Sequence, residues 1–290
     1  MTFAAVHRLH PVARLQTLLA GLVLGESPRW HDGRLWFSDW GAHEVVAVDA
    51  YGTREVVLEI DAFPFSIDWL LDGRLVVVGN GLVQRHEADG SLATHADLRE
   101  VSGHPWNEIV VDAHGNMYVN NIGFDMMGGQ APATGIVALV RPDGSVTEVA
   151  ADLQFPNGMA VTDDNSTLIV AESYAGRLTA FDITADGTLT NRHVWAEVAG
   201  SAPDGICLDA AGALWFADVP NRRCVRVREG GEVVDTVDAD RGCFACMLGG
   251  ADGTTLFIMA AEWHGPDGVD DARSGRVLTA VAPDAHAGRP

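Results

Sequence analysis

The sequence predicts an all-β fold, a six-bladed β-propeller with four antiparallel strands in each blade. A short motif recurs at intervals of roughly 40–50 residues, short apolar stretches alternate with turns rich in Gly and Asp, and no long stretch has helical periodicity. A repeat of this length built from short strands is typical of propeller blades. The copies begin at Glu26-Ser27-Pro28, Pro64-Phe65-Ser66, Trp106-Asn107-Glu108, Pro156-Asn157-Gly158, Pro203-Asp204-Gly205 and Phe244-Ala245-Cys246.

Each repeat contains strand-like stretches on either side of a turn. Residues 34–40 and 44–49 are rich in apolar, β-branched and aromatic side chains and flank a short turn, a pattern typical of a hairpin. The same plan is predicted for residues 74–78 with 82–86, 167–171 with 177–181, and 213–217 with 224–227. Outer turns such as Ala88-Asp89-Gly90 mark a further hairpin in each blade. This plan accounts for residues 1–290 as a single domain.

The two ends of the chain are expected to play different parts. The apolar stretch at residues 18–24 resembles the core of a secretion signal, but it leads directly into Gly25-Glu26 and the first repeat. We therefore expect it to be the outermost strand of the last blade, which would close the ring and cover its free edges. Residues 1–15 and 283–290 are expected to be terminal extensions, and the C-terminal one to be a frayed tail.

The composition excludes some partners. The chain has 40 Asp and Glu residues against 19 Lys and Arg, a net charge of −21, and the acidic residues are evenly spread. Such a charge repels phosphate backbones, so we expect neither nucleic acid nor an anionic membrane as a partner. No apolar run approaches the ~20 residues that a membrane helix needs. A small-molecule ligand is the expected partner, bound by a monomer or a small homo-oligomer.

The four cysteines are predicted to be reduced thiols. Most of them lie within apolar, strand-like stretches, where a buried and inert thiol is usual. The pair Cys243 and Cys246 has the spacing of half a zinc site, but no second Cys or His pair accompanies it. A cytoplasmic protein without disulfides is therefore expected.

The openings of the repeats predict a site on the axis. If each opening begins the innermost strand of its blade, residues far apart in sequence converge at the mouth of the central channel. Carboxylate and amide oxygens without His or Cys suit a hard divalent cation. Such an ion polarises a carbonyl and lowers the pKa of water, and Asp204 could take the proton from that water. The residues gathered there would be Glu26, Asn107, Glu108, Asn157 and Asp204, with Ser66 and the aromatic Phe65, Trp106, Phe155 and Phe244.

Simpler interpretations apply to several of these residues. Pro-Asn-Gly and Pro-Asp-Gly are ordinary turn sequences, but their recurrence at the phase of Glu26 favours the site. His104 and His264 lie near the predicted channel mouth and are the two histidines worth testing. No serine has a Gly-x-Ser-x-Gly context, and Met127-Gly128-Gly129 lacks the Lys and helix of a phosphate-binding loop.

At these residues the chain resembles the family of senescence marker protein (regucalcin), gluconolactonase and luciferin-regenerating enzyme. The resemblance covers essentially the whole chain. It implies a six-bladed propeller that binds one divalent metal ion on its axis and hydrolyses lactones. Its most specific stretches are Gly25-Glu26-Ser27-Pro28-Arg29-Trp30, Phe155-Pro156-Asn157-Gly158-Met159-Ala160, Pro203-Asp204-Gly205-Ile206-Cys207-Leu208-Asp209 and Cys246-Met247-Leu248-Gly249-Gly250.

The resemblance also implies roles for single residues. Carried over position by position, it makes Glu26, Asn157 and Asp204 the metal ligands, with Asp204 also the catalytic base. Asn107 falls at a substrate-binding Asn near the metal, and Asp125 falls where sugar-lactone members have a Glu that holds substrate hydroxyls. Ca²⁺ is the expected ion, with Mg²⁺, Mn²⁺ or Zn²⁺ as alternatives.

Three departures from the family pattern predict a less polar substrate. Pro105 stands where sugar-lactone members carry an Arg, Glu108 replaces the usual Asp, and Phe244 replaces a polar residue. Losing a hydroxyl-binding group discriminates against hydroxylated ligands, so we expect a less polar lactone or related ester. The predicted substrate-binding residues are Asn107, Asp125, Glu108, Phe65, Trp106, Phe124 and Phe244.

Two alternatives to a metal-dependent lactonase stay open. The scaffold could serve other carbonyl or ring-opening and ring-closing chemistry in a specialised pathway, because propellers host unrelated reactions. It could also be a non-catalytic propeller that binds a metal or a ligand. Three hard-oxygen ligands meeting on the axis favour an enzyme over a pure platform.

Overall fold

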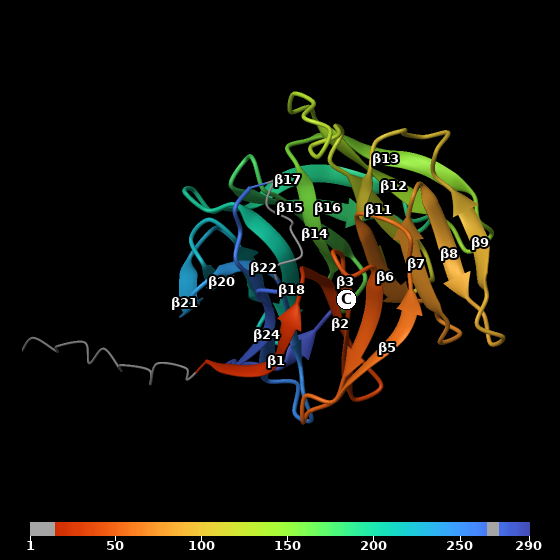
Figure 1. Cartoon of the computed structure of the whole chain (residues 1–290). Coiled ribbons are helices and arrows are strands. Elements are labelled where there is room, and N and C mark those ends of the chain that lie inside the picture. Colours follow the sequence, from red (N-terminus) through yellow and green to blue (C-terminus); the bar gives the residue numbers. More distant parts are fainter. Residues whose placement is uncertain (1–14, 266–272) are drawn as a thin grey trace, which may run out of the picture.

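The computed structural model describes residues 15–265 and 273–290, and it is a six-bladed β-propeller, as predicted. Figure 1 shows the sheets arranged around a common centre, with the first strand of each blade innermost. Blade 1 comprises β2 (Gly25–His31), β3 (Arg34–Asp39), β4 (Glu44–Val48) and β5 (Arg54–Glu59). Blade 2 comprises β6 (Phe65–Trp69), β7 (Leu75–Gly79), β8 (Leu82–His86) and β9 (Leu92–Asp97). Blade 3 comprises β10 (Trp106–Val111), β11 (Met117–Asn121), β12 (Gly135–Val140) and β13 (Val146–Leu153).

The second half of the ring repeats this antiparallel plan. Blade 4 comprises β14 (Pro156–Val161), β15 (Thr167–Glu172), β16 (Arg177–Ile183) and β17 (Leu189–Glu197). Blade 5 comprises β18 (Pro203–Asp209), β19 (Leu214–Asp218), β20 (Arg223–Val227) and β21 (Val233–Asp238). Blade 6 comprises β22 (Gly242–Gly249), β23 (Thr255–Ala261), β24 (Gly275–Val281) and β1 (Gln16–Leu22).

The N-terminal strand closes the ring. β1 pairs antiparallel with β24 and becomes the outermost strand of blade 6, so the two ends of the propeller share one sheet. This confirms the prediction for residues 18–24, since the N-terminal strand covers the outer edge of β24 and joins the two ends of the ring. The expected N-terminal extension falls almost entirely on residues 1–14, which lie outside the described residues.

The C-terminal residues are not a frayed tail, which corrects the prediction for residues 283–290. β25 (His286–Ala287) adds to the inner strand β18, and Arg289 and Val161 exchange two backbone hydrogen bonds of 2.7 and 2.8 Å. Asp284 also forms an ion pair with Arg226, at 2.6 Å. These contacts use the far ends of β14 and β18, and the C-terminus lies near the centre of the ring (Figure 1).

The hydrophobic core lies between neighbouring blades. One cluster joins blades 2 and 3 through side chains such as Val76 and Ile109, and another joins blades 4 and 5 through Ile169 and Phe216. All four cysteines are free and buried, as predicted, in the core of blades 5 and 6. In the part of the chain that the structure describes, no helix is long and apolar enough to cross a membrane.

Candidate metal centre and active site

Three inner strands present their second residue to the axis. Glu26 on β2, Asn157 on β14 and Asp204 on β18 each lie where the pairing with the next strand shifts register. A β-bulge of this kind leaves a residue out of the ladder and redirects its side chain. Asn157 and Asp204 are left out of the ladder in this way, whereas Glu26 pairs with Ser38 at the edge of its register shift.

Asn157 and Asp204 are each followed by a glycine, because the inner strands of neighbouring blades lie very close together at these positions. A Cβ atom on Gly158 would lie 2.5 Å from the carbonyl oxygen of Asp204, and one on Gly205 would lie 2.5 Å from the Cβ of Ala245. Neither distance leaves room for a side chain. Pro-Asn-Gly and Pro-Asp-Gly thus lie inside strands β14 and β18 and are not hairpin turns.

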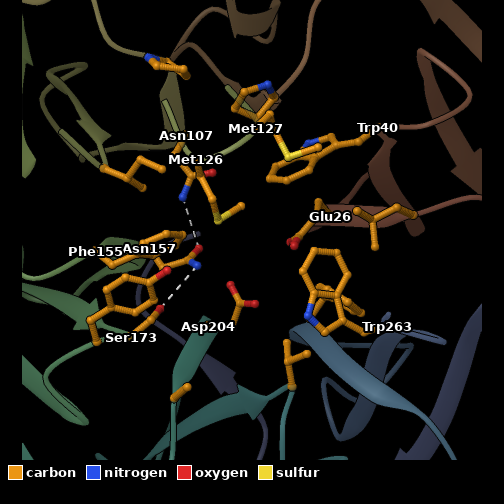
Figure 2. Close-up of a pocket in the computed structure, with 18 of the residues that line it drawn as sticks. Glu26, Trp40, Asn107, Met126, Met127, Phe155, Asn157, Ser173, Asp204 and Trp263 are labelled. Atoms are coloured by element: carbon orange, nitrogen blue, oxygen red, sulfur yellow. Dashed lines mark hydrogen bonds between the residues drawn. The ribbon is translucent and has the colours of Figure 1, made fainter. Parts of the chain in front are cut away.

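The three side chains form the floor of a cavity of about 410 Å³ at the mouth of the ring. Figure 2 shows Glu26, Asn107, Asn157 and Asp204 pointing toward one common space. Above this floor the walls are largely apolar. They include Leu24, Trp40, Phe63, Pro64, Pro105, Ile122, Met126, Met127, Phe155, Tyr174, Val219, Pro220, Phe244 and Trp263.

The floor holds two buried carboxyl groups with no basic side chain beside them. The carboxyl groups of Glu26 and Asp204 are buried, and none of the residues that line the cavity is Lys, Arg or His. Burial raises the pKa of Glu26 well above its usual value, and the charges of Asp204 and Glu108 raise it further. Burial, followed by the charge of Glu108, likewise raises the pKa of Asp204. A cation placed between the two carboxylates would remove this cost.

The residues present fit a hard divalent cation. Oδ1 of Asp204 is buried without a hydrogen-bond partner, which is unusual for a charged oxygen unless another ligand satisfies it. The set contains two carboxylates and one amide; no group of three or more His, Cys, Asp or Glu side chains placed to hold a metal occurs among residues 15–265 and 273–290. The oxygen-only set suits Ca²⁺, Mg²⁺ or Mn²⁺ better than a soft ion.

Four of the predicted substrate-binding residues do not line the cavity. Oε1 of Glu108 accepts hydrogen bonds from Arg29 Nη2 and Ser27 Oγ, both at 3.0 Å, and so faces away from the cavity. The rings of Phe65, Trp106 and Phe124 are at most 3% exposed and pack behind the walls. These four side chains support the site from behind, so direct contact with substrate is not proposed for them.

Asp125 and Phe244 do line the cavity, but Asp125 is also used locally. Its Oδ1 accepts a hydrogen bond of 2.7 Å from the backbone N–H of Gly128, and its own N–H donates to Gln130 Oε1 at 2.8 Å. This carboxylate therefore holds the turn that carries Met126 and Met127. Figure 2 shows the side chain of Met126 pointing toward the central space.

Sequence reasoning missed several cavity residues that belong to connections between strands. Met126 and Met127 lie on the long connection between β11 and β12, and Ser173 and Tyr174 follow β15 directly. Connections have no periodicity that points their side chains, so only the structure places them. Neither His104 nor His264 is among the residues lining the cavity.

The sequence profile described as SMP-30/Gluconolactonase/LRE-like region matches residues 24–262. The chain belongs to this family. It is 26% identical to regucalcin of Gallus gallus over 262 residues, 85% of each chain. It is 27% identical to pentonolactonase XacC of Haloferax volcanii over 251 residues, 84% of this chain and 78% of that one.

A solved structure of a gluconolactonase from Xanthomonas campestris is also similar. It is 26% identical in sequence, and the match covers 93% of this chain and 90% of the other with a TM-score of 0.75. The family and the ring architecture are thereby established for this chain.

Proposed function

We propose that this protein is a divalent-metal-dependent hydrolase that opens a lactone or a related cyclic ester. The observation that carries the proposal is the meeting of two buried carboxylates and one amide, Glu26, Asp204 and Asn157, at the floor of an otherwise apolar cavity. Membership of the family supports it, as do the similar proteins described as a pentonolactonase and a gluconolactonase. The substrate is a small molecule, since the cavity is of small-molecule size.

Glu26, Asn157 and Asp204 would hold the ion, with Ca²⁺ as the first choice and Mg²⁺, Mn²⁺ or Zn²⁺ as alternatives. When bound, such an ion supplies Lewis acidity to the ester carbonyl and to the attacking water. The oxygen-only set favours a hard ion, which is why Ca²⁺ comes before Zn²⁺.

The chain's own residues orient the substrate and move a proton. Asp204 is proposed as the base, because its Oδ1 has no hydrogen-bond partner and its carboxylate points toward the central space in Figure 2. Water oxygen attacks the carbonyl carbon while Asp204 takes its proton; the ring C–O bond then breaks, and the proton passes to the departing alkoxide to give a hydroxy acid. Asn107 also lines the cavity, and its Nδ2 donates to Asn157 Oδ1 at 3.3 Å, so we propose that it holds Asn157 in place and contacts the substrate from the same side.

The walls favour a substrate less polar than an aldonolactone. Beyond the floor, few polar groups remain, and one oxygen of Asp125 is already bonded to Gly128. Pro105 has no donor to offer in place of the family's Arg. Met126 and Met127 add flexible, polarisable thioethers that adapt to apolar ligands.

We expect kcat/KM for an alkyl δ-lactone to exceed that for glucono-δ-lactone by at least about 10-fold, because each buried hydroxyl left unpaired costs about 1–3 kcal/mol. The measurement is steady-state hydrolysis of both lactones under saturating metal. Pro105→Arg should narrow the ratio by restoring a donor, whereas Pro105→Ala should leave it unchanged.

A wild-type preference for glucono-δ-lactone would show that the apolar walls do not set the substrate class. Failure to open either lactone, in protein that binds metal, would favour other carbonyl chemistry at the same site.

A further inference from the structure

We propose that Ser173 is a positioning residue that fixes the amide of Asn157 with its oxygen toward the ion. The inference rests on the metal site of the proposed function. Ser173 follows β15 directly and lines the cavity. Its hydroxyl lies 3.4 Å from Asn157 Nδ2, the contact drawn in Figure 2, and 2.7 Å from the carbonyl oxygen of Pro203.

The direction of these two hydrogen bonds decides the orientation of the amide. A serine hydroxyl has one proton, and a carbonyl oxygen can only accept, so Ser173 donates to Pro203. Toward Asn157 the same oxygen can then only accept. The NH₂ group of Asn157 must therefore face Ser173, which puts Oδ1 on the Asn107 side of the central space (Figure 2). A flipped amide would place two N–H donors toward the ion and leave its oxygen without a donor at Ser173.

Two further contacts agree with this orientation. Asn107 Nδ2 donates to Oδ1 of Asn157 at 3.3 Å, which marks Oδ1 as the oxygen on that side. Asn120, which is fully buried, donates from its Nδ2 to the backbone carbonyl of Asn157 at 2.6 Å. The backbone and the side chain of Asn157 are thus held by separate partners, and Ser173 supplies an acceptor on the Nδ2 side of the amide.

The same hydroxyl joins two blades at the site. Asn157 belongs to β14 in blade 4, whereas Pro203 immediately precedes Asp204 on β18 in blade 5. One side chain thus links the positions of two proposed ligands. The blades themselves are packed by apolar residues such as Ala171 and Ile206, so loss of the hydroxyl should affect the metal ligand more than the fold.

The test is calorimetric titration of metal-stripped protein with Ca²⁺, with Mg²⁺ and Mn²⁺ titrated in parallel. Ser173→Ala should weaken binding of the preferred ion by about 10-fold or more, the usual effect of removing a group that orients a ligand. Ser173→Thr keeps the hydroxyl and should restore the affinity. Ser166→Ala is the matched control, because that exposed hydroxyl bonds only in its own turn, at 2.8 Å to Asp164.

The outcomes separate this inference from the proposed function. Wild-type protein that binds none of the ions would overturn both. Wild-type binding together with unchanged affinity in Ser173→Ala would overturn only the positioning role. If Ser173→Ala fails to fold, Ser173→Thr and Ser173→Cys decide, since Thr should match the wild-type affinity and Cys, a poorer hydrogen-bonding group, should be weaker; equal affinity in both would contradict the proposal.

Discussion

Asp204→Ala is expected to lower kcat/KM for lactone hydrolysis by at least about 10³-fold, because it removes a proposed metal ligand and the proposed base together. Asp204 lies on the bulge of β18, and its Oδ1 has no protein partner. The measurement is steady-state hydrolysis by the variant and the wild type under the same metal concentration, with bound metal determined in each.

The fold should survive this change. Asp204 is part of the cavity floor, and removing a buried carboxyl group near Glu26 relieves repulsion between the two. Asp164→Ala, in the exposed turn between β14 and β15, serves as the control and should keep full activity. A folded Asp204→Ala protein with wild-type turnover would mean that the reaction takes place elsewhere.

Arg29→Met is expected to destabilise the protein by about 3–5 kcal/mol, because it leaves buried carboxylates without their cation. Arg29 is 4% exposed, and its Nη2 lies 3.0 Å from Glu108 Oε1 and 2.6 Å from the carbonyl of Ile109. Its Nε lies 4.0 Å from Asp68 Oδ2; burial raises the pKa of Asp68, and Arg29 opposes that rise.

The free energy of unfolding in urea is the measurement for this prediction. Arg34→Met is the matched control: Arg34 pairs with Glu55 at 2.8 Å on the exposed surface, and such pairs contribute about 0–1 kcal/mol. Equal losses of unfolding free energy in the two variants would show that the buried contacts of Arg29 with Glu108 and Asp68 contribute no more than an exposed ion pair.

The ring and the floor of the site could be predicted because repetition specifies both. The opening motif occurs at the same position in all six repeats and marks the innermost strand of each blade. Because the blades are arranged around one axis, the side chains at the start of these strands converge there. The closing strand was predictable because residues 18–24 form an apolar stretch that leads directly into the first repeat. Asn157 and Asp204 looked like turn residues, and only their phase relative to Glu26 favoured the axis.

The direction of single side chains beside the floor could not be predicted. Glu108 directly follows Asn107, and the register shift between Trp106 and Glu108 decides which of them faces the cavity. The sequence also does not show that Arg29 of blade 1 forms an ion pair with Glu108 of blade 3. The two-residue strand β25 is too short for any periodic signal, so its pairing with β18 appears only in the structure.

The connections between strands account for the remaining differences. The site takes Met126 from one connection and Ser173 from another, and the carboxylate of Asp125 bonds to its own turn. Loops are positioned by contacts that vary from protein to protein, which is also why they set specificity. Positions on the strands could therefore be anticipated better than the walls of the cavity.

The most direct test of the central claim is hydrolysis of an alkyl δ-lactone by chelator-treated protein before and after metal is returned. We expect activity to fall to the uncatalysed rate when the metal is removed and to recover with Ca²⁺ or with another of the proposed divalent ions. The melting temperature should rise in parallel, since an ion at about 100 times its Kd stabilises the folded state by about 2.7 kcal/mol. Full hydrolytic activity in protein shown to contain no metal would contradict the account.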